Sequence, residues 1–120
     1  MKKKVKKLYL QQKKRYLQKI TGTAEKPRLS VFKSHNHIYA QLIDDKNACT
    51  LAFSSTLEKT LQTMFEKTAT KEASFIVGQD LAKKANQKNI KFVVFDRGSR
   101  PYHGRIKSLA EGSREQGLVF

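Results

Sequence analysis

The sequence predicts an α/β fold of mixed α+β character, in which helices pack against a mixed four-stranded sheet. Three observations support this prediction. Three short segments with strand-like alternation of apolar residues follow one another between residues 28 and 55. A segment with helical spacing comes next, and it leads into an apolar run at residues 91–96. A helix placed before such a run indicates a crossover to a parallel strand.

The three consecutive strands are expected at residues 28–34, 37–44 and 49–55. In the first of them, Leu29 and Val31 alternate with Ser30 and Phe32, so that the two pairs lie on opposite faces of a sheet. The two residues between the first and second strands include an asparagine, which suits a tight hairpin turn. Short turns between consecutive strands predict an antiparallel meander.

The later elements are expected at roughly residues 70–86 (helix), 91–96 (strand) and 104–116 (helix), with a shorter helical piece within 56–65. The run at 91–96 is continuously apolar, which is typical of a fully buried strand. Gly117 is a stop signal for the last helix. The order β-β-β-α-β-α is related to the topology of ribonuclease H-like domains. The predicted core comprises Leu29, Val31, Ile38, Leu42, Ile76, Leu81, Val93, Phe95, Ile106 and Leu109.

Positive charge is concentrated at the start of the chain. The net charge is +15, and residues 1–20 hold nine of the 25 Lys and Arg residues and no acid. Apolar residues recur there at three- to four-residue steps, which predicts an amphipathic helix with a thin apolar stripe. We therefore divide the chain into a basic arm and linker at residues 1–27, and a single globular domain at residues 28–120.

Three interpretations of the arm compete. A solvated tail and a helix on a membrane surface are both disfavoured, the second because the apolar stripe has no Trp or Phe. An arm that orders on a phosphate backbone is favoured, because a field this positive attracts polyanions, and nucleic acid is the commonest of these. The residues expected to contact phosphate are Lys2, Lys3, Lys4, Lys6, Lys7, Lys13, Lys14 and Arg15.

The residues do not predict catalysis, and no cofactor or metal is expected. Two-metal nuclease chemistry needs several converging carboxylates, whereas Asp44 and Asp45 stand beside a turn that favours Asp for its geometry alone. Asp96 is expected to pair with the arginines that follow it, or to hold the loop backbone, rather than to bind a metal. Cys49 is expected to be a small buried hydrophobe rather than a reactive thiol. No apolar run is long enough to span a bilayer, and a soluble protein in a reducing compartment fits best.

The segment FDRGSRPYHGR, at residues 95–105, is the candidate binding loop. It follows the predicted parallel strand, and the carboxyl end of such a strand is a usual place for a binding site. Its arginines suit phosphate oxygens and guanine edges, its aromatic rings can stack on bases, and its glycines let backbone approach a ligand. The helix that follows can favour an anion at its N-terminus. The competing interpretation is a charged surface turn that caps the sheet.

The motifs resemble those of a known family. Three segments are similar to bacterial-type ribosomal large-subunit protein eighteen: PRLSVFKSHNHIYAQLIDD, STLEK and FDRGSRPYHGRIKSLAEGSREQGLVF. They occur in the same order as in that family, and the basic arm before them is also similar. The resemblance implies a non-enzymatic protein that binds 5S rRNA and helps attach it to 23S rRNA in the central protuberance. It also implies neighbouring large-subunit proteins as partners, no membrane, and a ribosome of bacterial cytoplasm or plastid stroma. A small-subunit ribosomal protein of related fold, or a general RNA-binding protein, is the alternative.

The residue patterns and the family resemblance together predict RNA-binding residues outside the arm. Phe32 fits either the core or the exposed sheet face. The predicted residues are Arg28, Ser30, Ser34, His37, Tyr39, Gln41, Arg97, Gly98, Arg100, Tyr102, His103, Gly104, Arg105 and Lys107.

Overall fold

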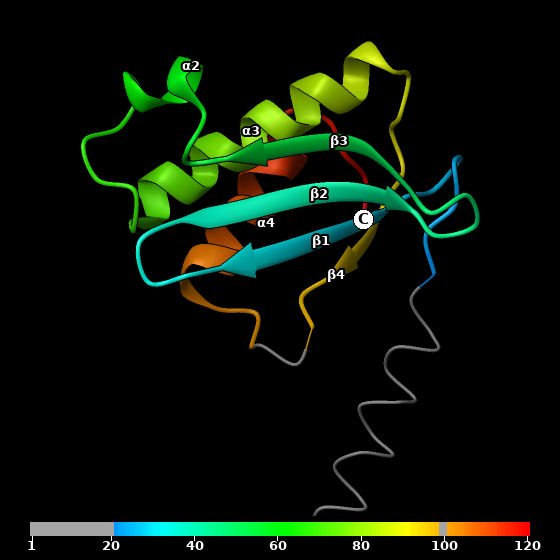
Figure 1. Cartoon of the computed structure of the whole chain (residues 1–120), viewed down its shortest axis with the longest axis horizontal. Coiled ribbons are helices and arrows are strands. Elements are labelled where there is room, and N and C mark those ends of the chain that lie inside the picture. Colours follow the sequence, from blue (N-terminus) through cyan, green and yellow to red (C-terminus); the bar gives the residue numbers. More distant parts are fainter. Residues whose placement is uncertain (1–20, 99–100) are drawn as a thin grey trace, which may run out of the picture.

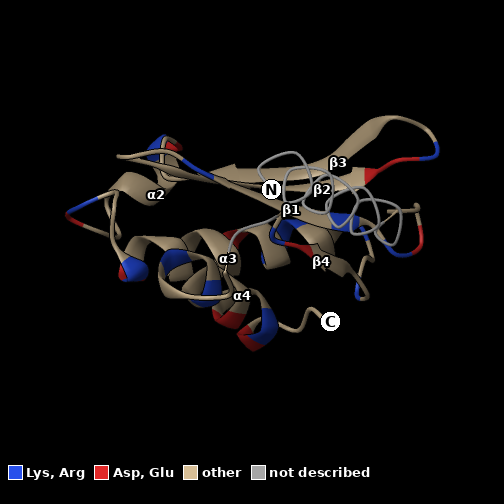
Figure 2. Ribbon diagram, turned by 90° about the horizontal axis from the view of Figure 1, so that it is seen from below, with Lys and Arg blue, Asp and Glu red and all other residues tan. Residues whose placement is uncertain are grey.

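The computed structural model describes residues 21–98 and 101–120. The expected helical arm therefore lies outside the described residues and stays a prediction, as does the relation to ribonuclease H-like domains. The described residues form two layers, with a four-stranded sheet on one side and two long helices on the other (Figures 1 and 2). The predicted mixed sheet with packed helices is confirmed.

The sheet has the strand order β3-β2-β1-β4. Its strands are β1 (Arg28–Lys33), β2 (Ile38–Asp44), β3 (Cys49–Ser55) and β4 (Val94–Asp96). The first three form the predicted antiparallel meander, and β4 pairs with β1 in parallel. Ser34 N donates to His37 O at 2.8 Å, which closes the predicted hairpin turn around residues 35–36. The crossover expected before the last strand is thus present.

The helices are α2 (Lys59–Gln62), α3 (Lys71–Gln87) and α4 (Gly104–Glu115). The long helix α3 begins at Thr70, whose hydroxyl accepts a hydrogen bond from Ala73 N at 3.1 Å and so satisfies one free amide of the first turn. The helix α4 ends one residue before the predicted boundary, and Gly117 follows it with a positive φ of 107°. The piece expected within residues 56–65 is only the one-turn helix α2.

The two long helices cross at unusually close range, because glycines lie at their contact. A Cβ placed on Gly78 of α3 would lie 2.1 Å from the carbonyl oxygen of Leu109, and one placed on Gly112 of α4 would lie 2.2 Å from that of Phe75. Ser113 Oγ donates to the Gly78 carbonyl at 3.1 Å across the same contact. The backbones therefore touch where other helix pairs interpose side chains.

The core lies between the sheet and these helices. Of the predicted core residues, eight are buried: Leu29, Val31, Ile38, Leu42, Leu81, Val93, Ile106 and Leu109. Ile76 and Phe95 are half-buried and pack against the same cluster. The alternation in the strands was sufficient to predict this face, because each buried strand position lies two residues from the next.

Two expectations about burial are wrong. The run at residues 91–96 is not fully buried, since β4 is an edge strand of three residues and Phe92 is 51% exposed. Cys49 is exposed rather than buried, because it begins the other edge strand beside the β2–β3 turn. In both cases the position of the strand in the sheet, which local periodicity does not specify, decides the exposure.

The outer edge of β3 is covered by groups from the rest of the chain. Lys84 Nζ donates to the carbonyl of Phe53 at 2.8 Å, Lys88 Nζ donates to that of Leu51, and Glu58 N donates to that of Ser55 at 3.3 Å. Burial opposes the charge of Lys84, but hydrogen bonds to the carboxylates of Glu58 and Asp80 raise its pKa overall. Carbonyls that are occupied in this way are poor templates for pairing with another strand.

Candidate RNA interface

Arg28 is held between two carboxylates at the start of β1. Its Nε and Nη2 donate to Asp45 at 3.0 and 3.1 Å, and its Nη1 donates to Asp96 at 2.8 Å. Asp45 also accepts from Gly22 N at 2.7 Å. The hydrogen bonds from Arg28 and then from Gly22 lower the pKa of Asp45, and the hydrogen bond to Asp45 is the largest of the causes that raise the pKa of Arg28. Arg28 thus joins the β2–β3 turn to the end of β4, and Asp45 joins both to Gly22 of the linker.

This ion pair predicts a pH-dependent stability. Because the folded-state pKa of Asp45 lies below its ordinary value of 3.8, the charged carboxylate stabilises the fold above that pH, and the contribution is lost as the pH falls through the folded-state pKa. Asp45→Asn is therefore expected to cost about 1–2 kcal/mol of unfolding free energy at pH 7. Urea unfolding of both proteins from pH 7 to 2.5 tests this: the cost should shrink below pH 3.8. An equal cost throughout would contradict an ionic origin.

Asp96 also shapes the candidate loop. Its Oδ1 accepts from Gly98 N at 2.8 Å, so it holds the loop backbone as predicted. It also pairs with Arg28 of the neighbouring strand, an arginine that lies before it in the sequence. The parallel pairing of β1 with β4 places Asp96 beside Ser30 and makes this partner available.

The loop and the β1–β2 turn meet at Arg105. Its Nη2 donates to the carbonyl oxygen of Ser34 at 3.1 Å, and its Nη1 is buried without a hydrogen-bond partner among the described residues. The turn is itself ordered, since His37 N donates to Ser34 Oγ at 3.1 Å and His37 Nδ1 lies 3.0 Å from Thr56 Oγ1. Arg105 is half-buried. It therefore connects two predicted RNA-binding segments that are 71 residues apart.

The backbone at the loop leaves groups available to a ligand. Gly98 and Gly104 have positive φ values of 66° and 59°, in the left-handed region that favours glycine, and a Cβ on either would meet no neighbour within 4 Å. His103 precedes α4 without a side-chain hydrogen bond to its amides, and the first turn of α4 has no acidic residue. The N-terminal amides of such a helix favour an anion.

The sheet face turned away from α3 and α4 is polar and aromatic. Ser30 lies directly opposite Gln41, and Phe32 lies opposite Tyr39, with their ring centroids 5.7 Å apart. Phe53 follows on β3 opposite Gln41. Phe32 is 55% exposed, and Phe53 is 41% exposed. Large exposed rings on a sheet suit stacking on unpaired bases.

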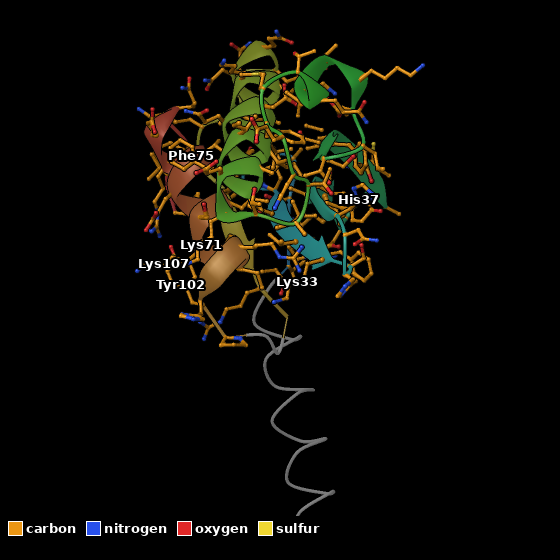
Figure 3. All side chains as sticks on the ribbon, turned by 90° about the vertical axis from the view of Figure 1, so that its left-hand side faces the viewer. Lys33, His37, Lys71, Phe75, Tyr102 and Lys107 are labelled. Carbon is orange, nitrogen blue, oxygen red and sulfur yellow. The ribbon has the colours of Figure 1, made fainter. Side chains whose placement is uncertain are left out.

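The structure places the predicted residues in two groups and leaves a third undescribed. Arg28, Ser30, Tyr39 and Gln41 are on the exposed sheet face, while Ser34, His37, Arg97, Gly98, Tyr102, His103, Gly104, Arg105 and Lys107 are in the turn, the loop and the start of α4. Tyr102, Lys107 and the neighbouring Lys33 gather toward one end of the molecule (Figure 3). Lys2, Lys3, Lys4, Lys6, Lys7, Lys13, Lys14, Arg15 and Arg100 lie outside the described residues.

Phe53 belongs to this surface although it was not predicted there, and Phe32 lies on the same exposed face rather than in the core. Both alternate with buried neighbours, Val31 and Ala52, so the same period of two that identified the core could have placed them on the exposed face. The residue type alone does not separate the two faces, because phenylalanine is more often found in a core.

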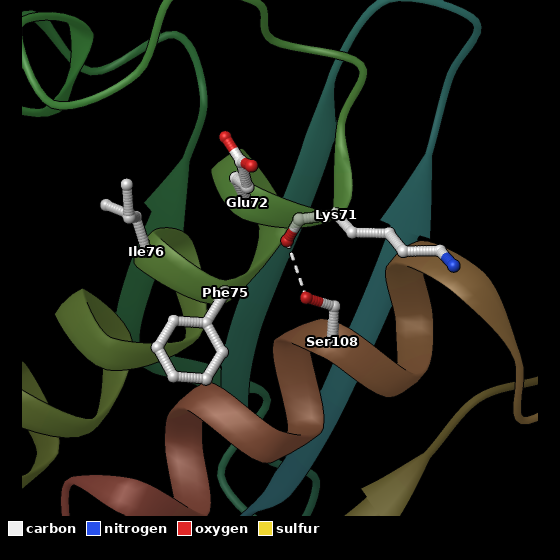
Figure 4. A pocket seen from close by; sticks show the side chains of 5 residues that line it. All are labelled: Lys71, Glu72, Phe75, Ile76 and Ser108. Carbon is white, nitrogen blue, oxygen red and sulfur yellow. Dashed lines mark hydrogen bonds between the residues drawn. The ribbon is translucent and has the colours of Figure 1, made fainter.

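The hollow between α3 and α4 has few polar groups that could bind a ligand. The hollow in Figure 4 lies between α3 and α4 and is lined by Lys71, Glu72, Phe75, Ile76 and Ser108. Ser108 Oγ donates to the Lys71 carbonyl there, and the walls are mostly apolar. Within residues 21–98 and 101–120, no group of three His, Cys, Asp or Glu side chains is placed to hold a metal ion. In the same ranges, no helix is long and apolar enough to cross a membrane.

Comparison with known proteins identifies the family. Residues 2–120 match the family described as ribosomal L18 of archaea, bacteria, mitochondria and chloroplasts. The chain belongs to the ribosomal L18 family. The resemblance predicted from the motifs of the hairpin and the loop is therefore confirmed. L18 proteins are structural constituents of the large ribosomal subunit that bind 5S rRNA, and they are not enzymes.

Several L18 relatives match most of the chain. It is 58% identical over 102 residues to large ribosomal subunit protein uL18c of Guillardia theta, which covers 85% of this chain and 95% of the relative. It is 59% identical over 106 residues to uL18 of Microcystis aeruginosa, with 88% of each covered. It is also 56% identical over 102 residues to uL18 of Bacillus cereus, with 85% and 83% covered. Bacterial and plastid-type L18 proteins thus match about equally well.

Proposed function

We propose that this protein binds 5S rRNA with the loop at residues 97–105, the β1–β2 turn and the exposed sheet face, and that it helps attach 5S rRNA to 23S rRNA in the central protuberance. Its partners are then these two rRNAs and the neighbouring large-subunit proteins. It works in the ribosomes of a bacterial cytoplasm or a plastid stroma. Membership of the L18 family supports the large subunit over the small-subunit alternative.

The observation that carries the proposal is the Arg105–Ser34 hydrogen bond. It fixes the loop beside the hairpin turn, so that the arginine-rich loop and the aromatic sheet face act as parts of one surface. Groups held in this way lose less conformational entropy on binding than mobile lysines do. The loop and sheet face are therefore the specific part of the interface, through stacking and base or phosphate contacts.

Arg28 has a second role within this proposal. All three of its guanidinium nitrogens already donate to Asp45 or Asp96. Any RNA contact by Arg28 is therefore secondary to holding the start of β1 and the end of β4 together. The division into an arm at residues 1–27 and a domain at 28–120 is kept as part of the proposal, with the arm contacting phosphates without reading sequence.

The test is a binding measurement with separate 5S, 16S and 23S transcripts at moderate salt. The protein is expected to prefer 5S rRNA, and Arg105→Ala is expected to weaken that binding by about 1–3 kcal/mol, because the loop loses its hydrogen bond to the β1–β2 turn and a buried group is left without its partner. Arg105→Lys keeps the charge but loses the planar fork, so it should recover little of the affinity. Gly104→Val should also weaken binding, because its φ of 59° favours glycine.

The matched control is Lys13→Ala, which removes one positive charge from the arm rather than from the loop. It should cost less than Arg105→Ala, because arm charges are many and interchangeable. A thermal melt of each variant checks that the half-buried Arg105 is not required for folding. Folded Arg105→Ala and Gly104→Val proteins with unchanged 5S affinity would show that the loop does not read the RNA. A stronger preference for 16S rRNA would favour the small-subunit alternative.

A further inference from the structure

Three aromatic rings, from β4, from the candidate loop and from the segment after α4, meet beside one another. Phe95 of β4 stacks on Phe120, with ring centroids 5.4 Å apart and an interplanar angle of 14°. Tyr102 of the loop also packs on Phe95, edge to face, with ring centroids 5.9 Å apart and an interplanar angle of 87°. Both arrangements are favourable geometries for aromatic pairs. Tyr102, which the loop contributes to this cluster, is half-buried.

Arg114 of α4 connects the two outer rings. Its guanidinium carbon lies 4.4 Å from the centroid of the Phe120 ring, within the range of a cation–π contact. Its Nη2 donates to the Phe120 carbonyl at 2.9 Å, and its Nη1 donates to Tyr102 Oη at 3.3 Å. Arg114 thus contacts both Phe120 and Tyr102, and Phe95 contacts the same two residues.

Phe120 is itself anchored to the sheet. Val119 N donates to the Lys91 carbonyl at 2.9 Å, and Val93 N donates to the Val119 carbonyl at 3.1 Å, so the segment pairs beside the start of β4. Leu118 is buried, with 2% of its surface exposed. This segment runs back from the end of α4 to the sheet (Figure 1). The backbone before Phe120 is therefore attached to the edge of the sheet beside β4.

We propose that Phe120 is a positioning residue for RNA binding, which holds Tyr102, and through it residues 101–105 of the loop, by way of Phe95 and Arg114. This inference rests on the proposed function, in which that loop binds 5S rRNA. Gly98 and Gly104 give the loop backbone freedom, and Asp96 and Arg105 hold its two ends. The aromatic cluster holds Tyr102 between these two contacts. A loop that is ordered only part of the time binds with correspondingly lower apparent affinity.

The test combines loop dynamics with RNA affinity in the full chain. Amide hydrogen exchange without RNA is measured by NMR for loop residues such as Gly98 and Tyr102, with Leu42 and Leu81 as core references. Phe120→Ala is expected to speed exchange in the loop about tenfold, to leave the core references unchanged, and to lower 5S rRNA affinity about fivefold. Binding to unstructured polyuridine, which depends on charge, should stay within about twofold.

Three further variants separate positioning from simple packing. Phe120→Tyr keeps the stacked ring and should restore both loop protection and 5S affinity. Phe120→Leu keeps an apolar side chain without a ring and should resemble Phe120→Ala, because stacking and the cation–π contact are lost. Val119→Ala, in the same segment with a side chain that is 45% exposed, is the matched control and should behave as the wild type.

Each alternative outcome has a definite meaning. Unchanged loop exchange in Phe120→Ala, or wild-type behaviour of Phe120→Leu, overturns the proposed support. Faster loop exchange with unchanged 5S affinity overturns the link between that support and RNA binding. If Arg105→Ala also leaves 5S affinity unchanged, the failure lies with the loop as the RNA-binding element, and not with Phe120 alone.

Discussion

Deleting residues 1–20 is expected to weaken binding to every RNA, by at least roughly tenfold at moderate salt, and to flatten the salt dependence of binding. The deleted segment holds nine of the 25 positive side chains and no acid. Each phosphate contact that is lost should reduce the slope of log K against log salt by about 0.7–0.9, because fewer counterions are released. Preference for 5S rRNA over an unrelated RNA should survive, since phosphate contacts carry no sequence information.

The measurement is a salt titration of binding to 5S rRNA and to a control transcript of similar length. Replacing Lys2, Lys3 and Lys4 by alanine in the full chain removes three of the nine charges, and should produce about a third of the change in slope. A truncated protein that binds as tightly as the full chain would refute the role of the arm. Loss of 5S preference on truncation would instead place sequence recognition in the arm.

Substituting the glycine at the helix crossing is expected to produce the largest loss of stability. Gly78→Ala introduces a Cβ that would lie 2.1 Å from the Leu109 carbonyl and 3.0 Å from Ser113 N, so α3 and α4 must move apart. Overpacking of this kind typically costs about 1–3 kcal/mol, and backbone on both sides leaves little room for relaxation. We expect a loss of about 2–3 kcal/mol in the free energy of unfolding.

Urea unfolding measures this effect, and its sign is informative. Alanine is a better helix former than glycine by about 1 kcal/mol, so Gly78→Ala would stabilise the protein if the helices were not in close contact. Gly112→Ala should also destabilise, since its Cβ would lie 2.2 Å from the Phe75 carbonyl. Lys83→Ala, at an exposed position of α3, is the control and should change stability by less than about 0.5 kcal/mol. A more stable Gly78→Ala protein would contradict the close crossing.

Local patterns were a reliable guide to the elements and to the faces of the strands. Alternation over residues 28–44 predicted which side chains of β1 and β2 face the helices, and Thr70 and Gly117 mark real helix boundaries. The boundaries of α2 were less predictable, because a single turn has too few residues to show helical periodicity. The family could be predicted from motifs at the hairpin and the loop, which the comparisons confirmed.

The partners of the charged and aromatic side chains were decided only by the tertiary structure. Sequence proximity suggested the arginines after Asp96 as its partners, whereas the parallel register also brings Arg28 to it, although Arg28 is 68 residues away. The contact of Phe120 with Phe95 likewise depends on a segment that returns to the edge of the sheet.

The sequence by itself determined the polyanion-binding character, the mixed sheet with its packed helices, and the family to which the protein belongs. These properties follow from net charge, from periods of two and 3.6 residues, and from short motifs, all of which are local or summed quantities. The exposure of Cys49 and Phe92, the glycine crossing and the Arg105–Ser34 junction were decided by the tertiary structure. The physical reason is that each depends on which strand lies at an edge and which backbone approaches which, and these are properties of pairs of segments far apart in the chain.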